Sequence, residues 1–478
     1  MTKNLTKEQE LFEKRSVPRA ILELAVPSVI GQIILVIYNM ADTLFVGMTG
    51  SDAMITAVTV CMPAFMFLSA ISNLFGVGGA SVISRALGVK DTDRAKKTAS
   101  FAVWGCLLTS LFYSLGAWLL MDLFVNFLGG SHPAIHGYAC QYLMITVVMG
   151  GSVTAMNTLL AHLIRAEGCS LQASVGIAIG GILNIALDPL FMFVLLTPGN
   201  EAMGAAIATS LSNLAALIYF TVVIFKKRKR LCLNAKPSLK IFRNGIPLDV
   251  VRVGLPACLM TLCENISYAI LDNLMVSAGI AAQAGIGVAK KVNMLAHCIV
   301  RGMAQGVLPL IGYNFAAGNR KRMRSVVLLS GSMSVLISIL CMAISLTFST
   351  QLIGLFIQNA SESITFGAKF LQILCIGAPF SACAYTIISF FQATGCGGRS
   401  LVLALLRKGV LDIPLMFVLN RLWPIFGIVS ATPIADVLCC ITALSLFVIF
   451  LRKHAHDTAK KAETLPAAEE PQPAAIGR

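Results

Sequence analysis

Long apolar runs constrain this chain more than any other feature of its sequence. A run of about 20 apolar residues can cross the hydrocarbon core of a bilayer as a helix. Twelve runs of about this length or longer follow one another along the chain: 21–47, 54–84, 98–126, 138–163, 170–197, 203–225, 249–277, 283–313, 325–350, 367–392, 400–420 and 425–451. Because helices satisfy every backbone hydrogen bond within lipid, the sequence predicts an all-α polytopic membrane protein with twelve transmembrane helices.

The composition supports this fold class. The chain is 57% hydrophobic, and its 37 basic and 22 acidic residues are too few for the polar shell of a soluble protein of 478 residues. Its formal net charge of +15 would suit nucleic acid if the basic residues gathered on one soluble face. They occur instead in short clusters between the apolar runs, so we predict no nucleic-acid partner.

Basic clusters alternate from loop to loop. They precede the first apolar run and follow the second, sixth, eighth and last runs, and single arginines follow the fourth and tenth. Apart from Arg421, the intervening loops hold no basic residue: 47–53, 126–137, 198–201, 279–282 and 351–365. Because cytoplasmic loops carry the excess of Lys and Arg, we expect a multi-pass protein of the cell (inner) membrane with both termini in the cytoplasm.

The second half of the sequence repeats the first. The segment ending at Pro27 recurs 229 positions later at Pro256, and the segment beginning at Asp42 recurs 230 positions later at Asp272. Two six-helix lobes of the same orientation, related by an axis along the membrane normal, are therefore expected. The predicted organisation is an N-terminal cytoplasmic segment (1–19), an N-lobe (20–225), a basic cytoplasmic linker facing membrane lipid (226–248), a C-lobe (249–451) and a disordered cytoplasmic tail (452–478).

Polar residues within the N-lobe runs are candidates for a cation site. Asn184 and Asp188 are four positions apart and share a helix face, and Asp42 lies at a similar depth in a parallel helix. With Thr209 nearby, these oxygens would suit Na⁺, or the two carboxylates would share a proton. The alternative is that both acids only cap helix breaks or form hydrogen bonds within the bundle. Asn157 is a further candidate near this site.

The C-lobe runs carry charges of both signs, so structural pairing competes with function there. Glu264 lies eight positions before Asp272, on roughly the same helix face, and is a candidate for contacting a cationic solute or coupling ion. Further charges lie at Arg301, Arg407, Lys408, Asp412 and Asp436. The other solute or coupling candidates are Asp272, Arg301, Gln32, Tyr38, Asn39 and Gln283.

The sequence resembles the MATE (multidrug and toxic compound extrusion) transporters, and more closely their bacterial Mep-type multidrug efflux branch. The resemblance covers about residues 17–451. It is carried by Pro27 and Asp42 on the first helix and by three further segments: Gly79-Ala-Ser-Val-Ile-Ser-Arg-Ala-Leu-Gly88, Arg165-Ala-Glu-Gly168 and Asn184-x-x-x-Asp188-Pro189.

This resemblance implies two six-helix lobes, alternating access, and export of organic cations in exchange for Na⁺ or H⁺. The family's first-lobe cation site would fall on Asp42, Asn184, Asp188 and Thr209. A C-lobe acid used by another branch would fall on Glu264, but the tenth run lacks the acid that accompanies it there.

The leading hypothesis is a secondary multidrug antiporter that works as a monomer, needs no cofactor and uses Na⁺ or H⁺ as its coupling ion. The alternative within the same class is a flippase or exporter of a lipid-linked or other amphiphilic solute, for which Arg301, Arg407 and Lys408 would supply a basic cavity. An enzyme is not expected, because the sequence contains no HExxH, GxSxG or GxxxxGK[ST] motif.

Overall fold

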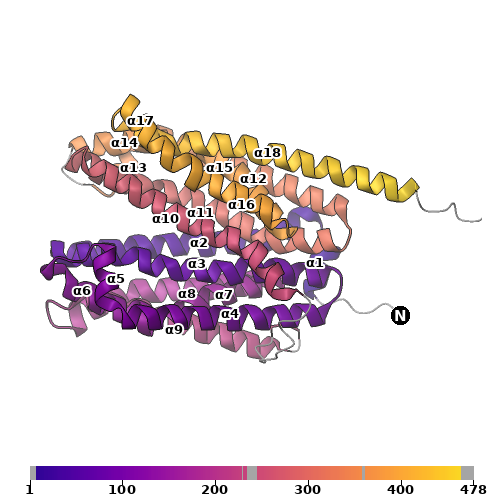
Figure 1. Cartoon of the computed structure of the whole chain (residues 1–478), viewed down its shortest axis with the longest axis horizontal. Coiled ribbons are helices and arrows are strands. Elements are labelled where there is room, and N and C mark those ends of the chain that lie inside the picture. The colour runs from indigo at the N-terminus through magenta and orange to yellow at the C-terminus, as the bar shows by residue number, and fades with distance from the viewer. Residues whose placement is uncertain (1–6, 229, 234–244, 358–360, 464–478) are drawn as a thin grey trace, which may run out of the picture.

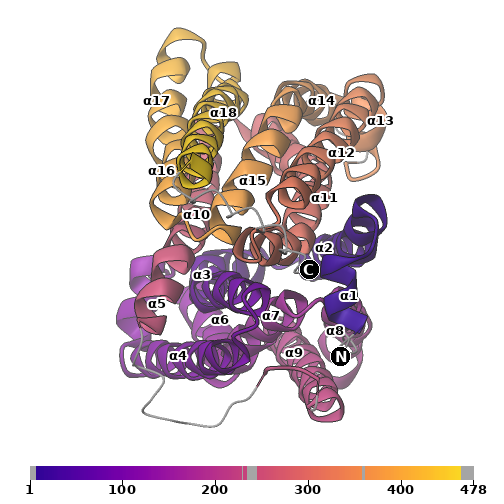
Figure 2. The same ribbon diagram turned by 90° about the vertical axis from the view of Figure 1, so that its right-hand side faces the viewer.

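The computed structural model describes residues 7–228, 230–233, 245–357 and 361–463, and its regular structure is helical. Two lobes of helices run side by side along the long axis of the molecule (Figure 1) and appear end-on in Figure 2. Helix α1 and the last residues of α18 lie at the same end. Most of the predicted linker (226–248) and tail (452–478) lies outside the described residues.

The first lobe follows α1 (Lys7–Glu13) and uses π-helical segments, labelled η, within two of its spans. Its elements are α2 (Val17–Met48), α3 (Asp52–Gly88), α4 (Thr92–Leu119), α5 (Met121–Leu128), α6 (Pro133–Leu143), η1 (Met144–Met149), α7 (Gly151–Ala166), α8 (Ser170–Pro189), η2 (Leu190–Leu195) and α9 (Glu201–Lys227). Helix α2 runs through Pro27 without a break.

The second lobe repeats this plan. Its elements are α10 (Ile246–Val276), α11 (Ile280–Ala316), α12 (Arg320–Thr347), α13 (Ser349–Gly354), α14 (Ser361–Ile376), α15 (Ala378–Ala393), α16 (Gly397–Leu405), η4 (Leu406–Asp412), α17 (Ile413–Leu422) and α18 (Phe426–Glu463). Segments η2 and η4 lie on opposite sides of corresponding residues: η2 begins after Asp188 and Pro189, whereas η4 ends at Asp412, before Pro414.

Eleven of the twelve expected spans are apolar enough to cross a membrane. Among the described residues, nine helices pass by length and hydropathy, and two bent pairs, α6–α7 with η1 and α14–α15, bring the number to 11. The remaining expected span, 400–420, is formed by α16, η4 and α17. It is less apolar because it contains Arg407, Lys408 and Asp412. The fold is therefore that of an all-α polytopic membrane protein.

Glycines on facing helices bring the two lobes into backbone contact. A Cβ atom on Gly254 of α10 would lie 1.7 Å from the carbonyl oxygen of Leu74 on α3, and one on Gly306 of α11 would lie 2.6 Å from Cα of Ala25 on α2. These contacts correspond in the repeat, since Gly254 lies 229 positions after Ala25 and Gly306 lies 228 after Gly78, which itself packs on α10. The lobes are therefore closely packed at the end that carries the basic loops.

Helix α1 connects the lobes at this same end. The sequence predicts a polar N-terminal segment over 1–19, but Phe12 is buried and stacks on Tyr313 of α11, with ring centroids 5.0 Å apart. The Tyr313 hydroxyl donates a hydrogen bond to Oε1 of Glu13 at 2.6 Å. Because α1 is joined directly to α2, a segment covalently attached to the N-lobe is docked on the C-lobe.

We expect the substitution Gly254→Ala to destabilise the protein, because its methyl group would collide with the α3 backbone. Overpacking of this kind typically costs about 1–3 kcal/mol. Thermal unfolding of the purified protein in detergent measures the effect. Gly116→Ala in α4 is the matched control, since a Cβ atom there meets nothing within 4 Å. Equal melting temperatures for the two variants would contradict the described contact between α3 and α10.

Candidate cation and solute sites

Three residues of the predicted cation site form one hydrogen-bonded group inside the N-lobe. The amide nitrogen Nδ2 of Asn184 on α8 donates to Oδ1 of Asp188 at 3.2 Å and to Oγ1 of Thr209 on α9 at 3.3 Å. All three side chains are buried, and Asp188 is 0% exposed. The four-residue spacing on one helix face therefore places the amide directly beside the carboxylate, as its periodicity predicts.

Helix α2 contributes Asp42 to the same region. Its side chain is buried, and it interacts electrostatically with Asp188. The ammonium group of Lys291 on α11 also acts on Asp42. Directly after Asp188 and Pro189 the helix changes to the π-helical segment η2. Wide helical turns of this kind are frequent at functional sites.

Oxygen atoms at this site lack hydrogen-bond partners among the described residues. They are Oδ1 of Asp42, Oδ1 of Asn184 and Oδ2 of Asp188. A buried acceptor without a partner is costly in free energy, and a buried carboxylate needs a counter-charge or a proton. Carboxylate, amide and hydroxyl oxygens are hard donors suited to a small cation. The arrangement can therefore hold Na⁺ or take up H⁺.

The C-lobe contains residues that correspond to Asp188, Thr209 and Asn184. Asp412 lies 224 positions after Asp188, and Thr432 lies 223 after Thr209. Thr432 donates to Oδ1 of Asp412 at 2.9 Å. At the position that corresponds to Asn184 stands Lys408, whose ammonium nitrogen lies 2.8 Å from Oδ2 of Asp412. The C-lobe carboxylate therefore has a covalently attached cation as its partner.

The other charged candidates named in the C-lobe also form ion pairs. Arg407 binds Asp436 with Nε 2.6 Å from Oδ1, and both side chains are buried. Glu264 on α10 forms an ion pair with Arg301 on α11, and Asp272 forms one with Lys290 on α11. Structural pairing, which the sequence left open, therefore accounts for each of these charges in this state.

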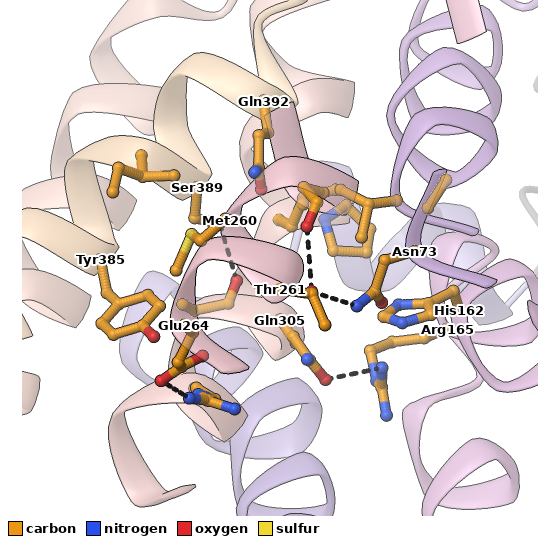
Figure 3. Close-up of a pocket in the computed structure, with 18 residues that line it drawn as sticks. Asn73, His162, Arg165, Met260, Thr261, Glu264, Gln305, Tyr385, Ser389 and Gln392 are labelled. Carbon is orange, nitrogen blue, oxygen red and sulfur yellow. Dashed lines mark hydrogen bonds and ion pairs between the residues drawn. The ribbon is translucent and has the colours of Figure 1, made fainter. Parts of the chain in front are cut away.

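A cavity of about 120 Å³ lies between the lobes (Figure 3). It is lined from both lobes, by α3 and α7 on one side and α10, α11 and α15 on the other, and Asn73 of α3 donates to Oγ1 of Thr261 on α10 across it at 2.9 Å. The residues labelled in Figure 3 are Asn73, His162, Arg165, Met260, Thr261, Glu264, Gln305, Tyr385, Ser389 and Gln392. Of the predicted solute contacts, Glu264 and Arg301 line it.

The remaining candidates lie elsewhere. Asn157 donates to Oδ1 of Asn213 on α9 at 3.0 Å, and Asn39 donates to the carbonyl oxygen of Leu35 within its own helix. Tyr38 lies beside Gly181 of α8 and interacts with both N-lobe carboxylates. Gln283 is exposed. Gln32 donates to Oε1 of Gln305 at 3.2 Å and so touches the C-lobe next to the cavity without lining it.

Both lobes of the chain match a known protein family. The model of the MatE family matches residues 27–190 and again 256–418, which together are more than half of the sequence. The chain belongs to the MatE family. The two matches begin at Pro27 and Pro256 and fall in different lobes, in agreement with the internal repeat. As a MatE protein the chain is a transporter and not an enzyme.

Curated relatives of this MatE protein cover nearly its whole length. It is similar to "Multidrug export protein MepA" of Staphylococcus saprophyticus, at 29% identity over 96% of this chain and 99% of the relative. It is also similar to the protein of the same name in Staphylococcus aureus strain MSSA476, at 29% identity over 93% and 97%.

Solved structures share the fold of this MatE protein. The crystal structure of MATE in complex with MaL6 has a TM-score of 0.85 at 24% identity and covers 96% of this chain and all of that one. The crystal structure of MATE in the straight conformation has a TM-score of 0.84 at 24% identity and covers 96% and 99%. The two-lobe architecture is therefore that of the MATE fold.

One cavity residue, Arg165, could not be recognised from the sequence pattern. Arg165 of this MatE protein follows the fourth apolar run and was assigned to a basic loop, yet it lies in the last turn of α7 and is 2% exposed. Gly168, with φ +86°, turns the chain there, as Gly395, with φ +78°, does 227 positions later. This turn directs α7 to end inside the protein, so an arginine expected in solvent lines the cavity instead.

We expect Asp412→Asn to destabilise this MatE protein strongly, because it leaves the buried Lys408 ammonium without a counter-charge. Breaking a buried ion pair on one side typically costs about 3–5 kcal/mol. Asp272→Asn is the control, since the half-exposed Asp272 pair should contribute only about 0–1 kcal/mol. Thermal unfolding in detergent compares the two.

Replacing both members of the buried pair, with Lys408→Met and Asp412→Leu, should recover most of this stability, because no uncompensated charge remains. A double variant that is less stable than Asp412→Asn alone would show that the pair has a different role.

Proposed function

We propose that this protein is a secondary active multidrug antiporter, which exports organic, lipophilic cations in exchange for Na⁺ or H⁺ by alternating access. Membership in the MatE family supports transport, and the names of relatives that align over nearly the full chain support multidrug export. The cation exchange is proposed from the N-lobe site itself.

One observation carries the proposal: the two lobes differ at equivalent positions. The C-lobe carboxylate Asp412 is neutralised by Lys408, whereas the N-lobe carboxylates Asp42 and Asp188 lie together with unpartnered oxygens and have Asn184 where the lysine would be. A carboxylate pair in a bundle of low dielectric needs a cation. The N-lobe site can therefore gain and lose a mobile cation, whereas the C-lobe site has the ammonium group of Lys408 as a permanent cation.

Helix α2 provides the connection between this site and the solute cavity. It carries Asp42 and, ten positions earlier, Gln32, which is bonded to Gln305 at the cavity. It also carries Ala25, which packs on Gly306 of the other lobe. Cation binding changes the charge at one part of α2, and a shift of this helix alters the contacts at the other. The two ligands need only favour opposite states of the transporter, and such coupling is typically about 1–3 kcal/mol.

The same proposal includes topology and assembly. The alternation of basic loops supports a cytoplasmic location for the closely packed end, with α1 and the end of α18. The proposal is that the described state faces outward from a cell (inner) membrane. The N-lobe (20–225) and C-lobe (249–451) are the two moving units, and the basic linker contacts anionic lipid. Both sites lie within one chain, which supports function as a monomer without a cofactor.

A flippase or exporter of a lipid-linked or other amphiphilic solute is the second candidate function. It is favoured by the cavity lining, in which the arginines Arg165 and Arg301 outnumber the single carboxylate Glu264. Binding of cationic dyes compared with lipid-linked sugars separates the two candidates.

Neutralising the N-lobe carboxylates should abolish ion coupling. In proteoliposomes under an imposed Na⁺ or pH gradient, applied one at a time, we expect Asp42→Asn and Asp188→Asn to reduce gradient-driven dye efflux by about 5- to 150-fold, the range of a typical coupling energy. Asp122→Asn, at an exposed acid of the same lobe, is the matched control. Full efflux by both variants at normal protein levels would overturn the proposed exchange.

Asn184→Lys tests the comparison between the lobes directly. The new ammonium should bind Asp188 as Lys408 binds Asp412, so that efflux no longer responds to either gradient while the protein remains folded. Melting temperature and dye efflux are measured on the same preparation. Retained gradient dependence in a folded Asn184→Lys variant would contradict the cation site.

A further inference from the structure

Arg165 lines the cavity between the lobes, and its guanidinium group forms no ion pair with any residue that the structure describes. Its Nη1 donates to Oε1 of Gln305 at 3.2 Å (Figure 3). Its Nε and Nη2 are buried and have no hydrogen-bond partner in the part of the chain that the structure describes. The same Gln305 oxygen also accepts from Gln32, so one neutral carbonyl is shared between two donors.

Other charges near the cavity do not compensate Arg165. Glu264, which also lines the cavity, is bound to Arg301. The last turn of α7 places Arg165 at the negative end of a helix dipole, but this interaction is worth only a fraction of a full counter-charge. An arginine that is 2% exposed and unpaired is costly unless another group supplies negative charge. An anionic group that enters the cavity would meet this need.

We propose that Arg165 is an anion-recognising subsite, which selects solutes that carry a carboxylate or similar anionic oxygen in addition to their positive charge. Nε and Nη2 form a planar fork on the edge of the guanidinium that Gln305 does not occupy. A carboxylate at this edge would accept from both donors, and charge-assisted bonds of this geometry are stronger than a bond to a neutral amide. This inference rests on the proposed function, because it names the class of solute that the exporter takes.

A bound inorganic anion such as chloride would share this chemistry, so the test must distinguish the two sources. Rhodamine B carries a carboxylate beside its cationic ring system, whereas rhodamine B ethyl ester has the same ring system and lacks the negative charge. The ratio of their affinities for the purified transporter in detergent, measured by fluorescence anisotropy in chloride and in gluconate buffer, reports on recognition of the carboxylate alone.

We expect Arg165→Gln to weaken rhodamine B binding by about tenfold or more, as loss of a charge-assisted hydrogen bond predicts, and to leave the ester unaffected. Arg165→Lys should give an intermediate ratio, because it keeps the charge and loses the fork. Arg421→Gln, at an exposed position of α17, should change neither affinity. For the wild-type protein, the ratio of the affinities for rhodamine B and its ethyl ester should be the same in chloride and in gluconate buffer.

Several results would overturn the inference. The first is an equal loss of affinity for both dyes in the folded Arg165→Gln variant, and the second is an affinity ratio that this substitution leaves unchanged. The third is failure of the wild-type protein to bind rhodamine B. The fourth is an effect of Arg165 that appears only as a dependence of the affinities on chloride. Efflux from proteoliposomes tests the proposed function separately. If the wild-type protein binds the ester but does not export it, the export function fails while the affinity ratio still decides the role of Arg165.

Discussion

The interior of this helical bundle must compensate every charge that it contains. Outside the helices lies lipid, and inside them the dielectric is low, so a buried ionised group without a counter-charge costs several kcal/mol. The C-lobe meets this requirement internally, through the pairs Arg407–Asp436 and Lys408–Asp412. The N-lobe does not, because its buried carboxylates Asp42 and Asp188 interact electrostatically and each has an oxygen without a hydrogen-bond partner among the described residues. The proposed mobile cation would supply the counter-charge of this lobe.

The need to compensate buried charge in the N-lobe is linked to the packing between the lobes. Backbone contact at Gly254 and Gly306 holds the lobes together at one end, and close contact of this kind depends on the absence of a side chain rather than on a strong attraction. A moderate change in free energy at the N-lobe site can therefore compete with it. Helix α1, joined to α2 but docked on Tyr313 of α11, adds a second contact that must adjust when the lobes separate.

Much of the fold could be predicted from the sequence, because its main determinants are local. Apolar run length and loop charge identify the spans, and the spacing of Asn184 and Asp188 on one face of a helix predicts their contact. The pairing of Glu264 with Arg301 could not be predicted in this way, because it depends on the rotation of α10 against α11. The position of Arg165 could not be predicted either. An arginine in a cytoplasmic loop and a buried arginine at a helix end both follow an apolar run in the sequence, and only the turn at Gly168 in the structure separates the two cases.

The two lobes also show why a repeated fold can perform a directional task. If both lobes held exchangeable cations, each could respond to the gradient independently, and the response of one lobe would not determine the geometry between them. With Lys408 fixed beside Asp412, the charge of the C-lobe core stays constant through the proposed cycle, and only the N-lobe changes its charge. In the proposed cycle α2 then moves relative to a lobe whose charge does not change. In the same cycle the solute cavity between the lobes responds to the occupancy of a single cation site, and the amide-to-lysine difference between Asn184 and Lys408 contributes to this division of roles.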